Sequence, residues 1–129
     1  MYTFMPKQIE EMIALGRRAG LVKMHLVAEN MPRARRLCNG IGAAWMPGWA
    51  RWLVGAVCPH LVVISLPHDI EYDNGSNVRD RWKSDWHFLT NGLRMAWYCK
   101  SRKTAYQAVA LWLCLRLFGA AAFNWKGAR

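Results

Sequence analysis

Apolar residues recur at helical spacing along this chain, and the pattern predicts a mainly α-helical fold. Near the N-terminus they fall three and four positions apart, as on one face of a helix: Ile9, Met12, Ile13 and Gly16. Pro6 stands just before them, where proline is tolerated in the first turn of a helix. A second, short helix is expected over residues 21–29.

The middle and the end of the chain predict further helices. They are expected over residues 47–58, over 79–99, and from Ser101 or Thr104, either of which can cap a helix, to a stop near Gly119. The β-branched run 61–64 is ambiguous between a strand and a buried helix. Four or five helices and at most one short strand make the predicted fold class mainly α.

One carboxylate falls on the apolar side of the long helix expected over 79–99. The apolar stripe of that helix is predicted to consist of Trp82, Trp86, Leu89, Leu93 and Ala96. Asp85 lies on the same stripe, and burial of a carboxylate is costly unless it is paired or hydrogen-bonded. Asp85 therefore needs a partner, which is either an arginine, in a purely structural pair, or a histidine, for which His68 is the candidate.

The segment around His68 has a chemistry of its own. If it is helical, His68 and Tyr72 lie one turn apart on one face, and Asp69 points about 100° away. A histidine held by a buried aspartate can act as a general base. Upstream, the loop around Gly40 and Gly42 can bring backbone carbonyls to a hard cation, to which an aspartate adds negative oxygen.

The order of these features resembles the phospholipase A2 superfamily, in both its secreted and its parvovirus-capsid forms. That family pairs a glycine-rich calcium loop with a helical His-Asp-x-x-Tyr motif, matched here at 68–72, and a second helix carries its catalytic Asp, matched at 84–88. More narrowly, the chain looks like small proteins of tailed phages. In those proteins an Asn-Gly-x-Gly loop, here 39–42, precedes the motif, and an Arg-Leu-Phe-Gly segment, here 116–119, follows it. The resemblance covers roughly residues 37–119.

The resemblance implies calcium-dependent hydrolysis of the sn-2 ester of phospholipids. His68 would deprotonate the attacking water, Asp85 would orient His68, and Tyr72 would brace that pair. Asp69 would bind calcium through its carboxylate. The backbone carbonyls of the calcium site would come from Cys38, Gly40 and Gly42. Calcium and the Gly40 amide would stabilise the developing oxyanion.

The resemblance also implies a small domain in which two central antiparallel helices carry His68 and Asp85. We expect a single domain over 1–129, with a basic helical segment over 1–36 and a tail over 120–129. The N-terminus has early acidic residues and lacks the apolar core of a signal peptide, which predicts synthesis without export. A virion or the host cytoplasm fits that expectation.

The chain departs from the secreted enzymes in two respects. Its four cysteines do not reproduce their disulfide framework, and they form no Cys-x-x-Cys pair, which disfavours a structural zinc module. Pro67 directly precedes His68 and restricts the backbone of Leu66, so the helix is expected to start late.

Two features concern membranes. Trp45 and Trp49 follow the loop, with Arg51 beside them, and a lipid-facing rim is expected there because tryptophan favours the membrane interface and arginine pairs with phosphate. The apolar stretches 42–66 and 105–123 are interrupted by proline or charged residues. They are expected as buried helices rather than as membrane spans.

The charge of the chain leaves other functions open. With 18 Lys and Arg against 8 Asp and Glu, its net charge is +10, and a basic surface attracts the phosphates of nucleic acid or of anionic lipids. The alternative to an enzyme is an inactive phage structural or host-interaction protein on the same fold. Such a protein would bind an acidic partner, another virion protein or nucleic acid through its basic face, although the chain has no recognised nucleic-acid motif. The basic patch is formed by Arg33, Arg35 and Arg36.

The acidic residues and histidines suggest two further interpretations. Five of the eight acidic residues fall within 69–85. This cluster is interpreted either as a cation site or as a solvated loop that pairs with neighbouring basic residues. A zinc site built from Cys58, His60 and His68 is disfavoured, because the spacing is poor and no fourth ligand is evident.

Overall fold

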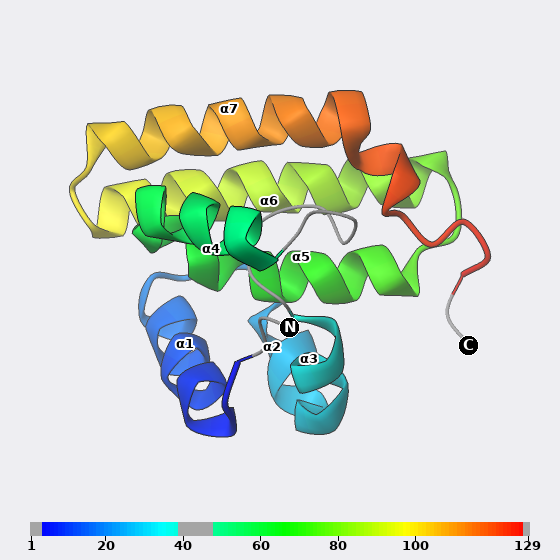
Figure 1. Ribbon diagram of the computed structural model, residues 1–129, viewed down its shortest axis with the longest axis horizontal. Coiled ribbons are helices and arrows are strands. Elements are labelled where there is room, and N and C mark those ends of the chain that lie inside the picture. Colours follow the sequence, from blue (N-terminus) through cyan, green and yellow to red (C-terminus); the bar gives the residue numbers. More distant parts are fainter. Residues whose placement is uncertain (1–3, 39–47, 128–129) are drawn as a thin grey trace.

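The computed structural model describes residues 4–38 and 48–127, and these form seven α-helices (Figure 1). No strand occurs among these residues, which confirms the predicted mainly α class. The ambiguous run 61–64 is helical: Leu61 ends a 3-10 turn, and the other three residues begin α5. The helices are α1 (Pro6–Arg18), α2 (Met24–Glu29), α3 (Met31–Leu37), α4 (Gly48–Val57), α5 (Val62–Asn74), α6 (Val78–Tyr98) and α7 (Arg102–Phe118). Two 3-10 turns, Pro59–Leu61 and Gly119–Ala121, precede α5 and follow α7.

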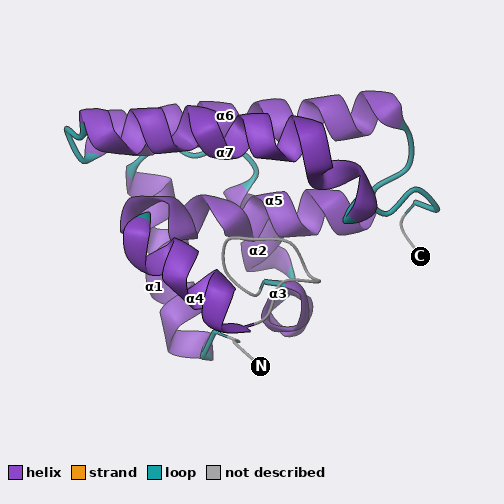
Figure 2. Cartoon of the chain, turned by 45° about the horizontal axis from the view of Figure 1, so that its top comes forward, coloured by secondary structure: helices purple, strands orange, loops and turns teal. Residues whose placement is uncertain are grey.

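The last three helices are stacked in layers. Figure 1 shows α7 above α6 and α6 above α5, each running opposite to its neighbour, and α6 packs against both of the others. The short helices α1, α2 and α3 cover the remaining side of α5. In Figure 2 the same three-helix stack lies to one side of the small helices. The apolar core is therefore centred on α5, and Leu61, Ile64, Leu66 and Ile70 are almost fully buried.

The ends of the helices follow local sequence signals. Pro6 occupies the first turn of α1, as predicted. The Ser101 side chain accepts a hydrogen bond from the Thr104 amide, so Ser101, and not Thr104, caps α7. Between α5 and α6, Gly75 adopts a φ of 59°, and a Cβ there would lie 1.8 Å from the carbonyl oxygen of Asn124. Only glycine fits this tight turn, which places α6 directly back on α5.

The expected late start of the His68 helix is wrong. α5 begins at Val62, and Pro67 lies inside it, fully buried. A proline within a helix removes one backbone hydrogen bond and costs about 3 kcal/mol. Burial of Val63, Ile64 and Leu66 in the core offsets that cost, because each such side chain contributes about 1.5–3 kcal/mol when removed from water.

The prediction that the apolar stripe of α6 forms its buried face is largely wrong. Trp82, Trp86 and Leu93 are 50%, 59% and 43% exposed. The buried side consists of Ser84, Asp85, Phe88, Asn91, Gly92, Met95 and Ala96. Because α6 lies between α5 and α7, a wide part of its circumference is buried. Small residues allow the close approach to α7: a Cβ on Gly92 would lie 2.5 Å from the Cβ of Ala108. The tryptophans of the stripe consequently lie outside the contact.

The expectation of buried helices for the stretches 42–66 and 105–123 holds only in part. The start of α5 is buried, whereas in α7 only Thr104 and Ala108 are, and most of its apolar side chains face outward. The segment Arg102–Ala121 is also long and apolar enough to cross a membrane by length and composition alone, and 17% of its most apolar window is buried. Residues 42–47 lie outside the described part of the chain.

Candidate active site

His68 and Asp85 face the same interior region from adjacent helices. His68 lies on α5 with 7% of its surface exposed, and Asp85 lies on α6 with none. The His68 ring packs against Tyr72, with centroids 4.2 Å apart, and against Phe88, with centroids 5.0 Å apart. Neither ring nitrogen makes a well-aligned hydrogen bond within the described part of the chain.

Asp85 has partners on three sides, as a buried carboxylate requires. The Tyr72 hydroxyl donates a hydrogen bond to Oδ1 at 2.5 Å, and Nη1 of Arg116 on α7 donates one to Oδ2 at 2.5 Å. Nε of Arg81 lies 3.8 Å from the same Oδ2. Of the two partners expected for Asp85, the arginine is the one that bonds it directly, and His68 interacts with it through its charge.

Tyr72 links the two candidate catalytic residues. Tyr72 and His68 both lie on the face of α5 that is turned toward α6. The Tyr72 ring therefore contacts His68, and its hydroxyl donates a hydrogen bond to Asp85 on α6. Burial and the bond to Asp85 raise the pKa of Tyr72 far above its ordinary value, so its hydroxyl keeps its proton and remains a donor. The arrangement fixes Asp85 beside His68.

Burial controls the protonation of His68. It lowers the pKa of the imidazole to about 4, although the charge of Asp85 and the backbone of Ser84 favour the protonated form. His68 is therefore neutral at physiological pH, as a proton acceptor must be.

The lowered pKa of His68 predicts a loss of stability in mild acid. The unfolded chain takes up this proton near pH 6.5 and the folded chain only near pH 4, so acid favours unfolding between these values. We expect the free energy of unfolding to fall by about 2 kcal/mol from pH 6.5 to pH 5. Burial raises the pKa of Glu71, which acts in the opposite direction at the lower end of this range.

Urea unfolding of the wild type, of His68→Gln and of His25→Gln checks this prediction. His25 is an exposed histidine on α2. The fall between pH 6.5 and pH 5 should persist in His25→Gln and disappear in His68→Gln. An equal fall in all three proteins would contradict a buried, neutral His68.

The predicted metal residues are described only in part. Cys38, directly after α3, is buried, and its Sγ lies 3.6 Å from the carbonyl oxygen of Leu66 on α5. Burial, and then the charge of Asp69, raise the pKa of the Cys38 thiol far above its usual range. The contact with Leu66 places Cys38 about one helical turn from Asp69 along α5. Gly40 and Gly42 lie outside the described residues.

The described residues do not include a complete set of metal-binding side chains. They contain no group of three or more His, Cys, Asp or Glu side chains suited to a metal. Near the candidate zinc ligands, His60 instead contacts Cys99, with 3.4 Å between Nδ1 and Sγ. The proximity of Asp69 and Cys38 fits a site made of one carboxylate and backbone carbonyls, which is oxygen chemistry suited to calcium.

The predicted lipid rim is also only partly described. Trp49 lies on α4 and is 71% exposed. Trp45 and the side chain of Arg51 lie outside what the structure describes.

Two carboxylates of the acidic segment 69–85 form ion pairs with neighbouring helices. Asp73 pairs with Arg33 of α3 at 2.8 Å, and Glu71 pairs with His87 of α6 at 2.8 Å. Its carboxylates thus tie α5 to two neighbouring helices, and Asp85 ties α6 to α7.

Sequence reasoning missed Arg116 as a member of the site. The expected burial of Asp85 left an arginine or a histidine open as its partner, and Arg116 lies 31 residues away, where only the packing of α7 on α6 brings it to Asp85. Its guanidinium also stacks over the Trp82 ring, 3.6 Å from the centroid. The signal available in the sequence was Arg116 within the otherwise apolar run 108–118 of α7.

Comparison of the chain with protein-family models, with curated proteins and with solved structures gave no match.

Proposed function

We propose that this chain is a phage-encoded, calcium-dependent phospholipase A2-like enzyme that hydrolyses the sn-2 ester of phospholipids. The observation that carries the proposal is the Tyr72–Asp85 hydrogen bond of 2.5 Å beside a buried, neutral His68. In this proposal α5 and α6 are the two central antiparallel helices of a phospholipase A2-like domain. A virion or the host cytoplasm is its proposed location.

In the proposed reaction His68 is the general base. Its neutral imidazole takes a proton from the water that attacks the ester carbonyl, and the negative charge of Asp85 stabilises the imidazolium that forms. Tyr72 and Arg116 hold both oxygens of Asp85, so this carboxylate needs no reorganisation during the reaction. Asp85 and Tyr72 therefore act through His68, as positioning residues.

The proposed calcium site uses Asp69, the residue that follows His68 on α5. Asp69 would hold calcium through its carboxylate, together with the backbone carbonyls of Cys38, Gly40 and Gly42. When bound, calcium supplies positive charge against the oxyanion that forms on the ester, and the Gly40 amide adds a hydrogen bond. Support for this site comes from the contact of Cys38 with the Leu66 carbonyl, about one helical turn from Asp69 on α5.

A second candidate function is a non-catalytic module on the same fold. The observation that favours it is the short ion pair between Asp85 and Arg116, with Arg81 nearby, which is what a purely structural buried pair looks like. Such a module would bind an acidic partner, such as nucleic acid or another virion protein, through its basic surface.

Calcium titration of the activity separates the two candidates. The measurement is fatty-acid release from vesicles of phosphatidylcholine and phosphatidylglycerol. Release by the wild type should require calcium, and Asp69→Asn should raise the calcium concentration needed by about tenfold or more, because the site loses its one carboxylate.

The matched control is Asp73→Asn on the same helix, where the aspartate pairs with Arg33. It should leave the calcium requirement unchanged. Release that is equally sensitive to calcium in both variants would contradict the proposed calcium site. No release from the folded wild type would favour the non-catalytic module.

A further inference from the structure

The outer side of the α6–α7 pair carries large apolar side chains that the fold leaves exposed. We call this surface the α6–α7 face. Trp97 is 87% exposed, and on α7 Tyr106 is 76% and Leu117 73% exposed. The face also includes Trp82, Trp86, Leu93, Val109, Leu113 and Phe118, each more than 40% exposed. Figures 1 and 2 show the two helices side by side along one side of the molecule. Large exposed apolar surfaces of this kind mark interaction sites.

The basic residues around this face indicate the charge of its partner. Residues 78–118 contain eight Lys and Arg but only two acidic residues, Asp80 and Asp85. Asp85 is fully buried beside Arg81 and Arg116, which are largely buried themselves, so six Lys and Arg and one acidic residue, Asp80, remain. The surface that α6 and α7 present is therefore strongly positive, and it attracts a partner with dense negative charge.

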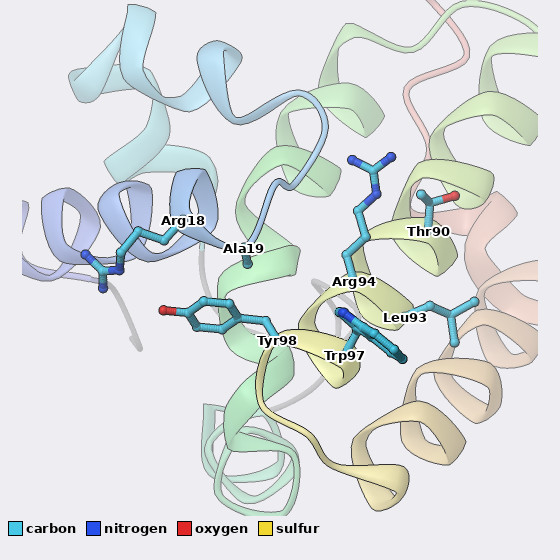
Figure 3. A pocket seen from close by; sticks show the side chains of 7 residues that line it. All are labelled: Arg18, Ala19, Thr90, Leu93, Arg94, Trp97 and Tyr98. Carbon is cyan, nitrogen blue, oxygen red and sulfur yellow. The ribbon is translucent and has the colours of Figure 1, made fainter.

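Two hollows flank Trp97 at the end of this face. One, of about 440 Å³, lies between α6 and α1 and has Arg18 and Arg94 in its lining. The other, of about 550 Å³, has Lys100 and Arg102. Figure 3 shows the first hollow, where the Tyr98 ring points toward α1 and Trp97 projects from the last turn of α6. Each hollow thus combines apolar walls with two cations, which suits a phosphate joined to an acyl chain.

Two contacts tie α7 to α6 within the fold. Arg116 donates to Asp85 at 2.5 Å, and removing one partner of a buried ion pair typically costs about 3–5 kcal/mol. The close approach of Gly92 and Ala108 packs α7 directly on α6. These contacts favour a pair of helices that lies flat on a membrane surface.

We propose that the α6–α7 face docks on the surface of an anionic phospholipid bilayer. The tryptophans and leucines enter the interface, where aromatic and apolar residues are favoured, and the surrounding Lys and Arg contact lipid phosphates. A second copy of the chain fits the face less well, because two such faces would bring like charges together. Nucleic acid offers phosphates but no apolar environment for Leu93, Leu113 and Leu117.

The inference goes beyond the proposed function because docking needs neither calcium nor His68. It also differs from the lipid rim expected around Trp49, which lies on α4. Arg116 connects the face to the candidate site, since it stacks on Trp82 and binds Asp85.

Vesicle sedimentation in the presence of a calcium chelator tests the docking, because hydrolysis is then excluded. The vesicles contain either phosphatidylcholine alone or phosphatidylcholine with phosphatidylglycerol. The wild type should bind the anionic vesicles at least tenfold more tightly than the neutral ones, since each basic residue near an anionic surface contributes about 1 kcal/mol. Trp97→Ala/Leu117→Ala should weaken binding to the anionic vesicles at least tenfold, because both side chains lose their contact with the interface.

Trp49→Ala tests the lipid rim expected on α4 as the competing docking surface; Trp49 is 71% exposed and Trp97 87%. This variant should change binding less than twofold. Because the substituted residues are exposed, every variant should keep the thermal midpoint of the wild type within a few degrees, and this is measured in parallel.

Three results would overturn the docking face. One is unchanged binding by Trp97→Ala/Leu117→Ala, and another is loss of binding in Trp49→Ala alone. The third is a wild type that dimerises through this face, is monomeric in Trp97→Ala/Leu117→Ala, and ignores vesicles. Loss of hydrolysis with retained vesicle binding would contradict the enzyme proposal and leave the docking face intact.

Discussion

Arg116→Met is expected to lower the free energy of unfolding by about 3 kcal/mol. The substitution keeps most of the apolar stem but removes the guanidinium that donates to Oδ2 of Asp85. Asp85 has no exposed surface, so water cannot replace the lost partner. Tyr72 still holds Oδ1, and Arg81 at 3.8 Å compensates only in part.

Urea unfolding of a double-mutant cycle measures the pair itself. Asp85→Asn, Arg116→Met and the combined variant should show a coupling of about 1–3 kcal/mol, since the second substitution no longer strands a buried charge. Arg79→Met, at an exposed arginine in the first turn of α6, is the matched control and should shift stability by less than about 0.5 kcal/mol. Additive effects, or an Arg116→Met no worse than the control, would contradict a buried ion pair at Asp85.

His68→Gln is expected to reduce fatty-acid release by about 10²–10⁴-fold, the usual contribution of a general base. Glutamine cannot accept the proton of the attacking water at neutral pH, yet it is close to histidine in size and polarity. His87→Gln changes the other histidine of these two helices, which pairs with Glu71. It should retain activity within about threefold.

Far-UV circular dichroism and thermal unfolding establish whether both proteins are folded. If His68→Gln is folded and as active as the wild type, His68 is not the base. If both variants lose activity equally, the effect comes from the α5–α6 contact rather than from the chemistry of His68.

Much of the fold was predictable because its signals are local. Pro6 and Ser101 mark helix ends through backbone geometry and capping, and the structure confirms them. Asp85 is buried as expected, although most of the apolar stripe from which its burial was predicted is exposed.

The wrong predictions concern which faces of α6 and α7 pack against other helices. The tryptophans of α6 were expected to be buried because they are large and apolar, whereas small residues, Gly92 above all, make the contact with α7. Likewise, the apolar composition of α7 predicted burial, but only a narrow side of that helix faces the domain. The hydrophobic pattern of a single helix does not show whether its apolar face packs in the core of the domain or remains exposed for contact with another molecule.

In the candidate site, too, contacts within one helix were predictable, whereas contacts between distant segments were not. The position of Tyr72 and His68 on one face of α5 follows from their spacing within one helical turn. The Arg116 bond to Asp85 and the contact of Cys38 with α5 join parts of the chain that are distant in sequence, so only the tertiary fold brings them together.

The most direct test of the proposed enzyme is the position of the ester that it cleaves. Vesicles of a phospholipid with different acyl chains at sn-1 and sn-2 are incubated with the wild type, with calcium or with chelator, and the products are identified by mass spectrometry. The proposal predicts the sn-2 fatty acid and the matching lysophospholipid, with calcium only. Intact phospholipid after incubation with folded, vesicle-bound protein and calcium, or release from sn-1, would contradict it.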